Sequence, residues 1–202
     1  RVPARELPWL VLGSLGALGI GAVPVVALLC AGAPPKAMGA QGMFGTMASA
    51  GLATQVALVL SGSVLVGIAE ELAFRGCLQR SLLASWRVGP AITLTAVIFA
   101  LSHGASARVV SVLPISFFLG YVAWRADSIL PGMVCHMVVN AIGQTSLAVF
   151  ASLVSKAGQH AGGVHLRLVE IAPTLVAVLV AGVLLLWLAV RRVERIVRGG
   201  GR

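Results

Sequence analysis

The sequence has little charge, and this excludes an ordinary soluble domain. Only 10% of its 202 residues are charged, whereas 58% are hydrophobic and the mean hydropathy is +0.99. Soluble domains normally carry about 25% charged residues. The sequence also lacks the short alternating polar and apolar segments that a transmembrane β-barrel requires. Its long unbroken apolar runs instead predict an all-α, polytopic transmembrane helical bundle.

Cysteine motifs and clustered basic surfaces are also missing. The three cysteines, Cys30, Cys77 and Cys135, lie far apart without a C-x-x-C motif, so we expect small buried residues and no disulfide or metal site. The net charge of +9 comes from basic residues that stand singly between apolar runs or gather in residues 191–198. This distribution is typical of residues that set topology and contact lipid headgroups. We therefore expect the lipid bilayer as a partner, and no nucleic acid.

Turn signals divide the chain into about six spans in one membrane domain, residues 1–202. The predicted spans are residues 9–29, 46–86, 91–107, 109–124, 128–154 and 171–190, with loops at 31–45 and 156–170. Six spans leave both termini on one side, and placing them in the cytoplasm puts eleven Lys and Arg residues inside and four outside. This is a positive-inside bias. The Ala- and Arg-rich, Lys-poor composition further predicts a bacterial inner membrane.

A pair of acidic residues ends an uncharged run that covers residues 37–69. Carboxylates within a membrane are costly, rare and usually functional. Glu71 lies four residues before Arg75, so the two side chains are expected to form an ion pair on one helix face. Glu70 points about 100° away on the same helix and has no such partner. The spacing thus predicts a structural role for Glu71 and leaves Glu70 for chemistry.

Three further polar residues interrupt the later spans: His103, His136 and Asn140. Counting from the turn near residue 88, Glu70 and His103 come to a similar depth, and His136 and Asn140 share one helix face. Each residue alone is equally well explained as an interhelical hydrogen bond, worth about 0.6–2 kcal/mol.

Together these residues supply groups that suit hydrolysis. Glu70 is a candidate general base for water, the histidines would orient that water or bind a metal, and Asn140 would stabilise an oxyanion. His103, His136 and Glu70 also have the composition of a catalytic zinc site, although H-E-x-x-H is absent. A proton relay needs only the titratable groups, so it stays open as well.

Three motifs in order carry a resemblance to a known family. Glu70-Glu71-x-x-x-Arg75, Phe99-x-x-x-His103 and His136-x-x-x-Asn140 lie within residues 64–143, a motif-bearing core. This pattern resembles the CPBP family of intramembrane proteases, which includes type II CAAX prenyl endopeptidases and bacteriocin-processing and self-immunity (Abi) proteins.

The resemblance implies a role for each motif residue. Glu70 would activate water, Glu71 and Arg75 would support the site, and Phe99 would pack beside it. His103 and His136 would be ligands or water-orienting groups, and Asn140 would be an oxyanion or water partner. Whether zinc or another divalent metal takes part is left open by the motifs.

Three hypotheses follow from these residues. The first is an intramembrane endopeptidase that cleaves peptides or lipidated peptides, for example near a prenylated C-terminus. The second is a non-hydrolytic membrane protein, either a proton-coupled transporter or a bacteriocin-immunity partner, although the sequence shows no internal repeat. The third is a scaffold whose polar residues only hold helices together. We rank them in this order.

Overall fold

A computed structural model describes residues 2–30, 50–104, 106–158 and 168–199, and this part of the chain is helical without strands. The expectation of an all-α fold is therefore confirmed. In chain order the elements are η1 (Ala4–Glu6), α1 (Leu7–Cys30), α3 (Leu52–Leu60), η3 (Ser61–Leu65), α4 (Val66–Glu70), η4 (Glu71–Gln79), α5 (Arg80–Leu83), α6 (Val88–Leu101), α7 (Ser106–Ala126), α8 (Leu130–Gly158) and α9 (Leu168–Gly199). Elements α3 to α5 form one continuous helix, so the described residues make six helical segments.

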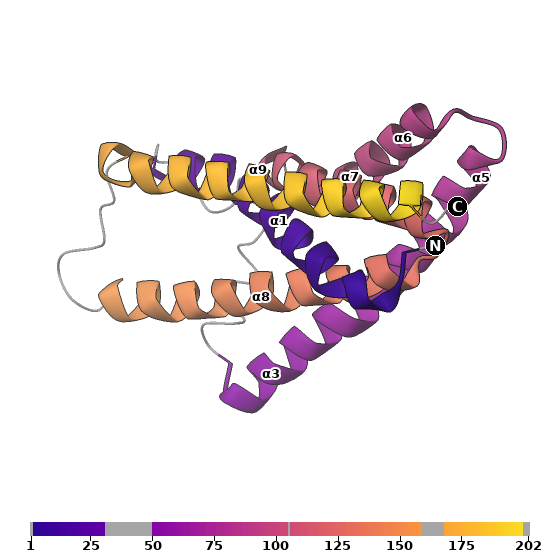
Figure 1. Cartoon of the computed structure of the whole chain (residues 1–202). Helices are drawn as coiled ribbons and strands as arrows, with labels where there is room; N and C mark the ends of the chain where they lie inside the picture. The colour runs from indigo at the N-terminus through magenta and orange to yellow at the C-terminus, as the bar shows by residue number, and fades with distance from the viewer. Residues whose placement is uncertain (1, 31–49, 105, 159–167, 200–202) are drawn as a thin grey trace.

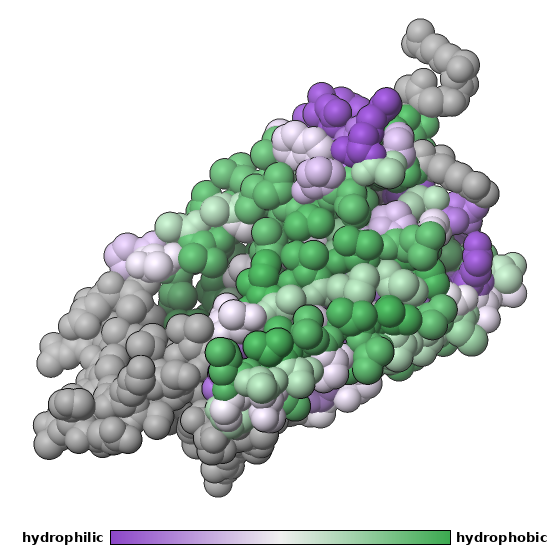
Figure 2. Space-filling view, turned by 90° about the horizontal axis from the view of Figure 1, so that it is seen from below, coloured by the Kyte–Doolittle hydropathy of each residue, from purple (hydrophilic) through white to green (hydrophobic). Residues whose placement is uncertain are grey.

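Four of these segments are long and apolar enough to cross a membrane. They cover Ala4–Leu28, Leu52–Leu83, Ala107–Ala126 and Ala172–Arg198. Large apolar side chains lie open on their surfaces; Leu52 is 77% exposed and Leu65 is 66% exposed. The face seen in Figure 2 is accordingly covered mostly by hydrophobic side chains, with strongly hydrophilic residues near its margins. A broad exposed apolar surface of this kind fits contact with lipid.

The core lies between the first, fourth, fifth and last segments. It is formed by apolar side chains from α1, α7, α8 and α9, namely Leu10, Ala17, Ile115, Phe118, Leu119, Val122, Cys135, Val139, Ala189 and Val193. Helices α1 and α9 approach closely at Gly16 and Gly182, because a Cβ atom at Gly182 would lie 2.7 Å from the Gly16 carbonyl oxygen. Small residues at such crossings let membrane helices pack backbone against backbone.

The two ends of the described chain meet at one end of the bundle (Figure 1). Arg192 near the end of α9 pairs with the buried Glu6 before α1, at 2.9 Å between Nε and Oε2. The basic residues 191–198, which we expected to form a tail after the last span, continue α9 instead. Arg75, which entered the count of inner basic residues, is only 2% exposed and lies inside the bundle.

The third segment is shorter than predicted, because α6 ends at Leu101 instead of near residue 107. The side chains of Ser102 and His103 both donate hydrogen bonds to the Phe99 carbonyl oxygen, and Gly104 adopts a positive φ of 80°. A left-handed glycine with side-chain partners for the last carbonyls is a common helix stop. Fourteen residues span about 21 Å, short of the ~30 Å hydrocarbon layer. His103 therefore lies in a turn and not within a span.

Other predicted boundaries move by smaller amounts. The turn expected at residues 87–90 ends earlier, because α6 begins at Val88. Helix α8 continues to Gly158, beyond the predicted end of the fifth span at residue 154. The predicted loop at 31–45, the start of the second span at 46–49 and most of the loop at 156–170 lie outside the described residues. Among the cysteines, Cys135 is buried as expected, but the prediction is wrong for Cys77, which is exposed; neither forms a disulfide.

Candidate active site

The second helical segment carries the acidic pair at the point where its geometry changes. The α-helical part α4 ends at Glu70, and a π-helical stretch begins at Glu71 and runs to Gln79. Three polar side chains on this stretch, Glu71, Arg75 and Gln79, are each no more than 2% exposed. π-Helical turns are rare and are frequent at functional sites. The polar face of this helix is thus turned into the protein and away from lipid.

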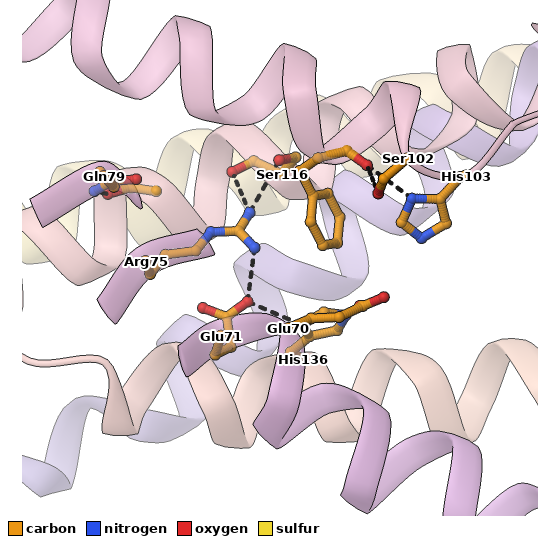
Figure 3. A network of polar contacts seen from close by, with 10 residues as sticks. Glu70, Glu71, Arg75, Gln79, Ser102, His103, Ser116 and His136 are labelled. Carbon is orange, nitrogen blue, oxygen red and sulfur yellow. Dashed lines mark hydrogen bonds and ion pairs between the residues drawn. The ribbon is translucent and has the colours of Figure 1, made fainter. Parts of the chain in front are cut away.

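Glu71 is held by two partners through a single carboxylate oxygen. Arg75 donates a hydrogen bond from NH1 to Oε1 at 2.8 Å, which confirms the predicted ion pair. His136, from α8, lies 2.9 Å from the same oxygen through Nδ1. Figure 3 shows these contacts, with Arg75 on one side of Glu71 and His136 on the other. Glu71 is therefore buried and held through Oε1 alone, whereas its buried Oε2 has no hydrogen-bond partner among the described residues.

Glu70 lies on the other side of the same imidazole. Its Oε2 is 3.4 Å from Nε2 of His136, and its side chain is 25% exposed, whereas the Glu71 side chain is fully buried. One histidine therefore lies between two carboxylates that are adjacent in sequence. Of the two, Glu70 is the one that an incoming molecule can reach.

The hydrogen-bond partners decide which nitrogen of each imidazole carries a proton. The Glu71 oxygen that accepts from Arg75 can only accept, so Nδ1 of His136 must be a donor. Nδ1 of His103 faces the Phe99 carbonyl oxygen at 2.8 Å and must also donate. In both histidines Nε2 is left for other partners.

The Glu70–His136 pair lies beside a buried ion pair. Arg75 and Glu71 carry opposite charges, and their NH1 and Oε1 atoms lie 2.8 Å apart. Two acceptors cannot bond to each other, so a hydrogen bond between Glu70 and Nε2 of His136 requires a proton between them. The two side chains are therefore placed to act as an acid and a base.

Phe99 joins the second motif to the other two. It is 1% exposed, and its ring centroid lies 4.8 Å from that of His103 and 5.7 Å from that of His136. The Cζ atom of Arg75 lies 4.5 Å from the centroid of the same ring. Phe99 therefore packs beside the site as expected, and it places His103 next to His136 without a direct polar contact.

Asn140 lies further away than the sequence suggested. Its side-chain amide donates a hydrogen bond to the carbonyl oxygen of Gly62 at 3.4 Å, in the earlier π-helical stretch η3. The structure therefore brings together Glu70, Glu71, Arg75, Phe99 and His136, with His103 adjacent. Asn140 shares the helix face of His136, but its hydrogen bond holds α8 against the second segment.

The residues of the site do not form a ligand set for a metal. Within the described part of the chain, no three His, Cys, Asp or Glu side chains lie close enough together to hold an ion. Both nitrogens of His136 already face carboxylates, and Nδ1 of His103 is bound to a backbone carbonyl. The expected combination of His103, His136 and Glu70 around zinc does not occur in this arrangement.

Sequence reasoning missed two residues that support the site from behind. Ser116 of α7 accepts hydrogen bonds from NH2 of Arg75, and Gln79 donates one to the Gly120 carbonyl oxygen. Gln79 lies four residues after Arg75 in an apolar segment, a polar spacing that could have identified it. A lone serine in a span carries no comparable signal.

Comparison with known families agrees with this arrangement. Residues 52–142 match the family described as type II CAAX prenyl endopeptidase Rce1-like. This region is therefore similar to the Rce1-like family. The Rce1-like region contains all three motifs and agrees with the resemblance inferred from them. No curated protein and no solved structure matches the chain.

The match to the Rce1-like family supports a protease that works at a membrane on a peptide substrate. The apolar helices around the Rce1-like region make the chain a multi-pass membrane protein.

Proposed function

We propose that the chain is an intramembrane endopeptidase in which Glu70 activates the attacking water. The observation that carries this proposal is the placement of His136 between a buried, Arg-paired Glu71 and a partly exposed Glu70. A carboxylate that is reachable and has an acid at its side is suited to general acid–base chemistry on an amide.

The proposed reaction begins with Glu70 as the carboxylate and His136 protonated at Nε2. Glu70 takes a proton from water, and the resulting hydroxide attacks the carbonyl carbon of the scissile bond. The Nε2 proton of His136 donates a hydrogen bond to the oxyanion that forms. When the C–N bond breaks, Glu70 returns its proton to the leaving nitrogen. Glu71 stabilises the positive imidazole in the way that the buried aspartate of a catalytic triad does.

His103 is proposed to orient the water. Its Nδ1 is fixed by the Phe99 carbonyl, so Nε2 presents a lone pair that accepts a hydrogen bond from water. Asn140 is one turn from His136, and its engagement with Gly62 supports a role in holding the helices in register. We retain an oxyanion or water contact for Asn140 as a prediction, to be tested with Asn140→Ala.

We further propose that the substrate is a membrane-associated peptide of the CAAX type, and that the motif-bearing core covers residues 64–143 within a single membrane domain. The family supports the substrate class, and the exposed apolar surface of the second segment is suited to a lipid-linked chain. The inner membrane of a bacterium, with both termini in the cytoplasm, is the proposed location. Glu6, near the start of the chain, and Arg192, near its end, meet at one end of the bundle. This contact supports the placement of both termini on the same side of the membrane.

A cleavage assay tests the proposal. The protein is reconstituted in liposomes, and the substrate is a quenched-fluorescent peptide with a farnesylated CAAX-type end. We expect Glu70→Gln to lower the rate roughly 100-fold or more. Glu194→Gln is the matched control, because Glu194 pairs with Arg125 away from the site. Wild-type cleavage by Glu70→Gln would overturn the mechanism.

Three further measurements separate the alternatives. An unprenylated copy of the peptide tests whether the lipid is recognised. Inhibition by a chelator, reversed by zinc, would replace the metal-independent mechanism with a metalloprotease. Proton flux that depends on Glu70, without any cleavage, would favour the transporter hypothesis instead.

A further inference from the structure

Two hydrogen-bonded contacts join the π-helical stretch η4 to α7. The NH2 group of Arg75 donates to both the carbonyl oxygen and the hydroxyl oxygen of Ser116, at 3.0 and 2.9 Å. Nε2 of Gln79 donates to the carbonyl oxygen of Gly120 at 2.9 Å. The two donors are four residues apart and so are the two acceptors, so the helices run parallel and in fixed register. We call this pair of contacts the α7 bridge.

The α7 bridge is buried and closely fitted. Arg75, Gln79 and Ser116 are each at most 2% exposed. A Cβ atom at Gly120 would lie 2.8 Å from Oε1 of Gln79 and 3.0 Å from Cγ2 of Ile92. A side chain at position 120 would require the Gln79 amide or Ile92 to shift. The register between η4 and α7 is therefore set by polar contacts as well as by packing.

The bridge is continuous with the site through one rigid group. The guanidinium of Arg75 is planar, so holding NH2 against Ser116 also fixes the direction of NH1, which contacts Glu71. The guanidinium of Arg75 also lies over the face of the Phe99 ring, which restricts its movement. The Glu71 oxygen that receives NH1 also receives Nδ1 of His136. The orientation of the His136 imidazole is thus linked to α7 through Arg75 and Glu71.

We propose that Ser116 is a positioning residue for this reaction, and that Gln79 supports it by keeping α7 in register. Ser116 acts through Arg75 and Glu71 and aims Nε2 of His136 at Glu70. This inference rests on the proposed function for its effect on the rate, but its effect on His136 can be measured without any substrate.

Two readouts on Ser116→Ala test the inference. The first is peptide cleavage, for which we expect about a tenfold loss in kcat with KM unchanged, as for a modest misplacement of a reacting group. The second is the Nδ1 proton resonance of His136 in histidine-labelled protein, assigned by its loss in His136→Gln. We expect this resonance to shift or broaden in Ser116→Ala.

Ser111→Ala is the matched control, because it removes another serine hydroxyl of α7, one that donates to the Arg108 carbonyl oxygen within the same helix. It should change neither kcat nor the His136 resonance. In an Arg75→Lys background, where the planar link is gone, Ser116→Ala should lower the rate further by less than about twofold.

The outcomes separate the inference from the proposed function. If the wild type cleaves nothing but the His136 resonance moves only in Ser116→Ala, the proposed function fails and the positioning inference stands. An unchanged resonance in Ser116→Ala overturns the positioning inference. Equal effects of Ser116→Ala and Ser111→Ala on rate and resonance would also overturn it, because they would reveal a general loss of packing.

Discussion

The same isosteric change should destabilise the protein much more at Glu71 than at Glu70. Glu71→Gln removes the counter-charge of Arg75, whose side chain is fully buried, while Glu70→Gln alters a side chain that is 25% exposed and makes one 3.4 Å contact. Removing one partner of a buried ion pair typically destabilises a protein by about 3–5 kcal/mol. Loss of a partly exposed contact is worth about 1 kcal/mol or less.

These energies convert into a difference in thermal stability. For a protein of 202 residues, 1 kcal/mol corresponds to a change in Tm of about 2–4 °C. Glu71→Gln should therefore lower Tm by roughly 6–20 °C, and Glu70→Gln by no more than about 4 °C. Both variants should lose cleavage, Glu70→Gln because the base is gone and Glu71→Gln because His136 is no longer held.

The difference in Tm between the two variants is measured by circular dichroism while the purified proteins are heated in the same detergent. Cleavage at a temperature well below both transitions separates chemistry from unfolding. A Glu70→Gln variant that is destabilised as much as Glu71→Gln would refute the division of roles. It would favour the scaffold hypothesis, in which both carboxylates only hold helices together.

Three further changes test other parts of the structure. His103→Ala should abolish cleavage but lower the free energy of unfolding by only about 1 kcal/mol, measured by the same heating assay, because Ser102 still caps the Phe99 carbonyl. Gly182→Ala should destabilise the α1–α9 contact by about 1–3 kcal/mol, whereas Gly143→Ala, whose Cβ meets nothing within 4 Å, should leave Tm unchanged or slightly raised. Single cysteines at positions 5 and 195, in a chain without its native cysteines, should react with an impermeant maleimide only in inside-out vesicles; labelling from the opposite face would reverse the proposed topology.

The sequence allowed the helical class and much of the site to be predicted, because both depend on local signals. Long apolar runs predict helices in a bilayer, and an i, i+4 spacing predicts the Glu71–Arg75 pair. Counting residues from the turn also placed Glu70 and His103 at a similar depth, and both now lie beside His136 or its neighbour Phe99. These predictions needed only residue spacing and the rise of a helix.

Other features depend on contacts between segments and could not be predicted in this way. A periodic pattern does not show that α6 stops at Leu101, since that stop depends on two side chains bonding one carbonyl. Nor does it show that Asn140 bonds to Gly62, 78 residues earlier. The contribution of Ser116 was equally hidden, because a serine in a membrane span is unremarkable until its partner is known.

The position of His136 explains how two neighbouring glutamates can be so different. On a regular helix, adjacent side chains point about 100° apart, and only one of them is expected to face a given partner. Here the helix changes from α to π between Glu70 and Glu71, and a single imidazole meets both carboxylates. Glu71 receives Arg75 and becomes a buried, fixed acceptor for Nδ1. Glu70 receives only Nε2 and stays partly open. The same local sequence thus supplies a buried carboxylate that orients the histidine and, next to it, a partly exposed carboxylate that we propose as the base.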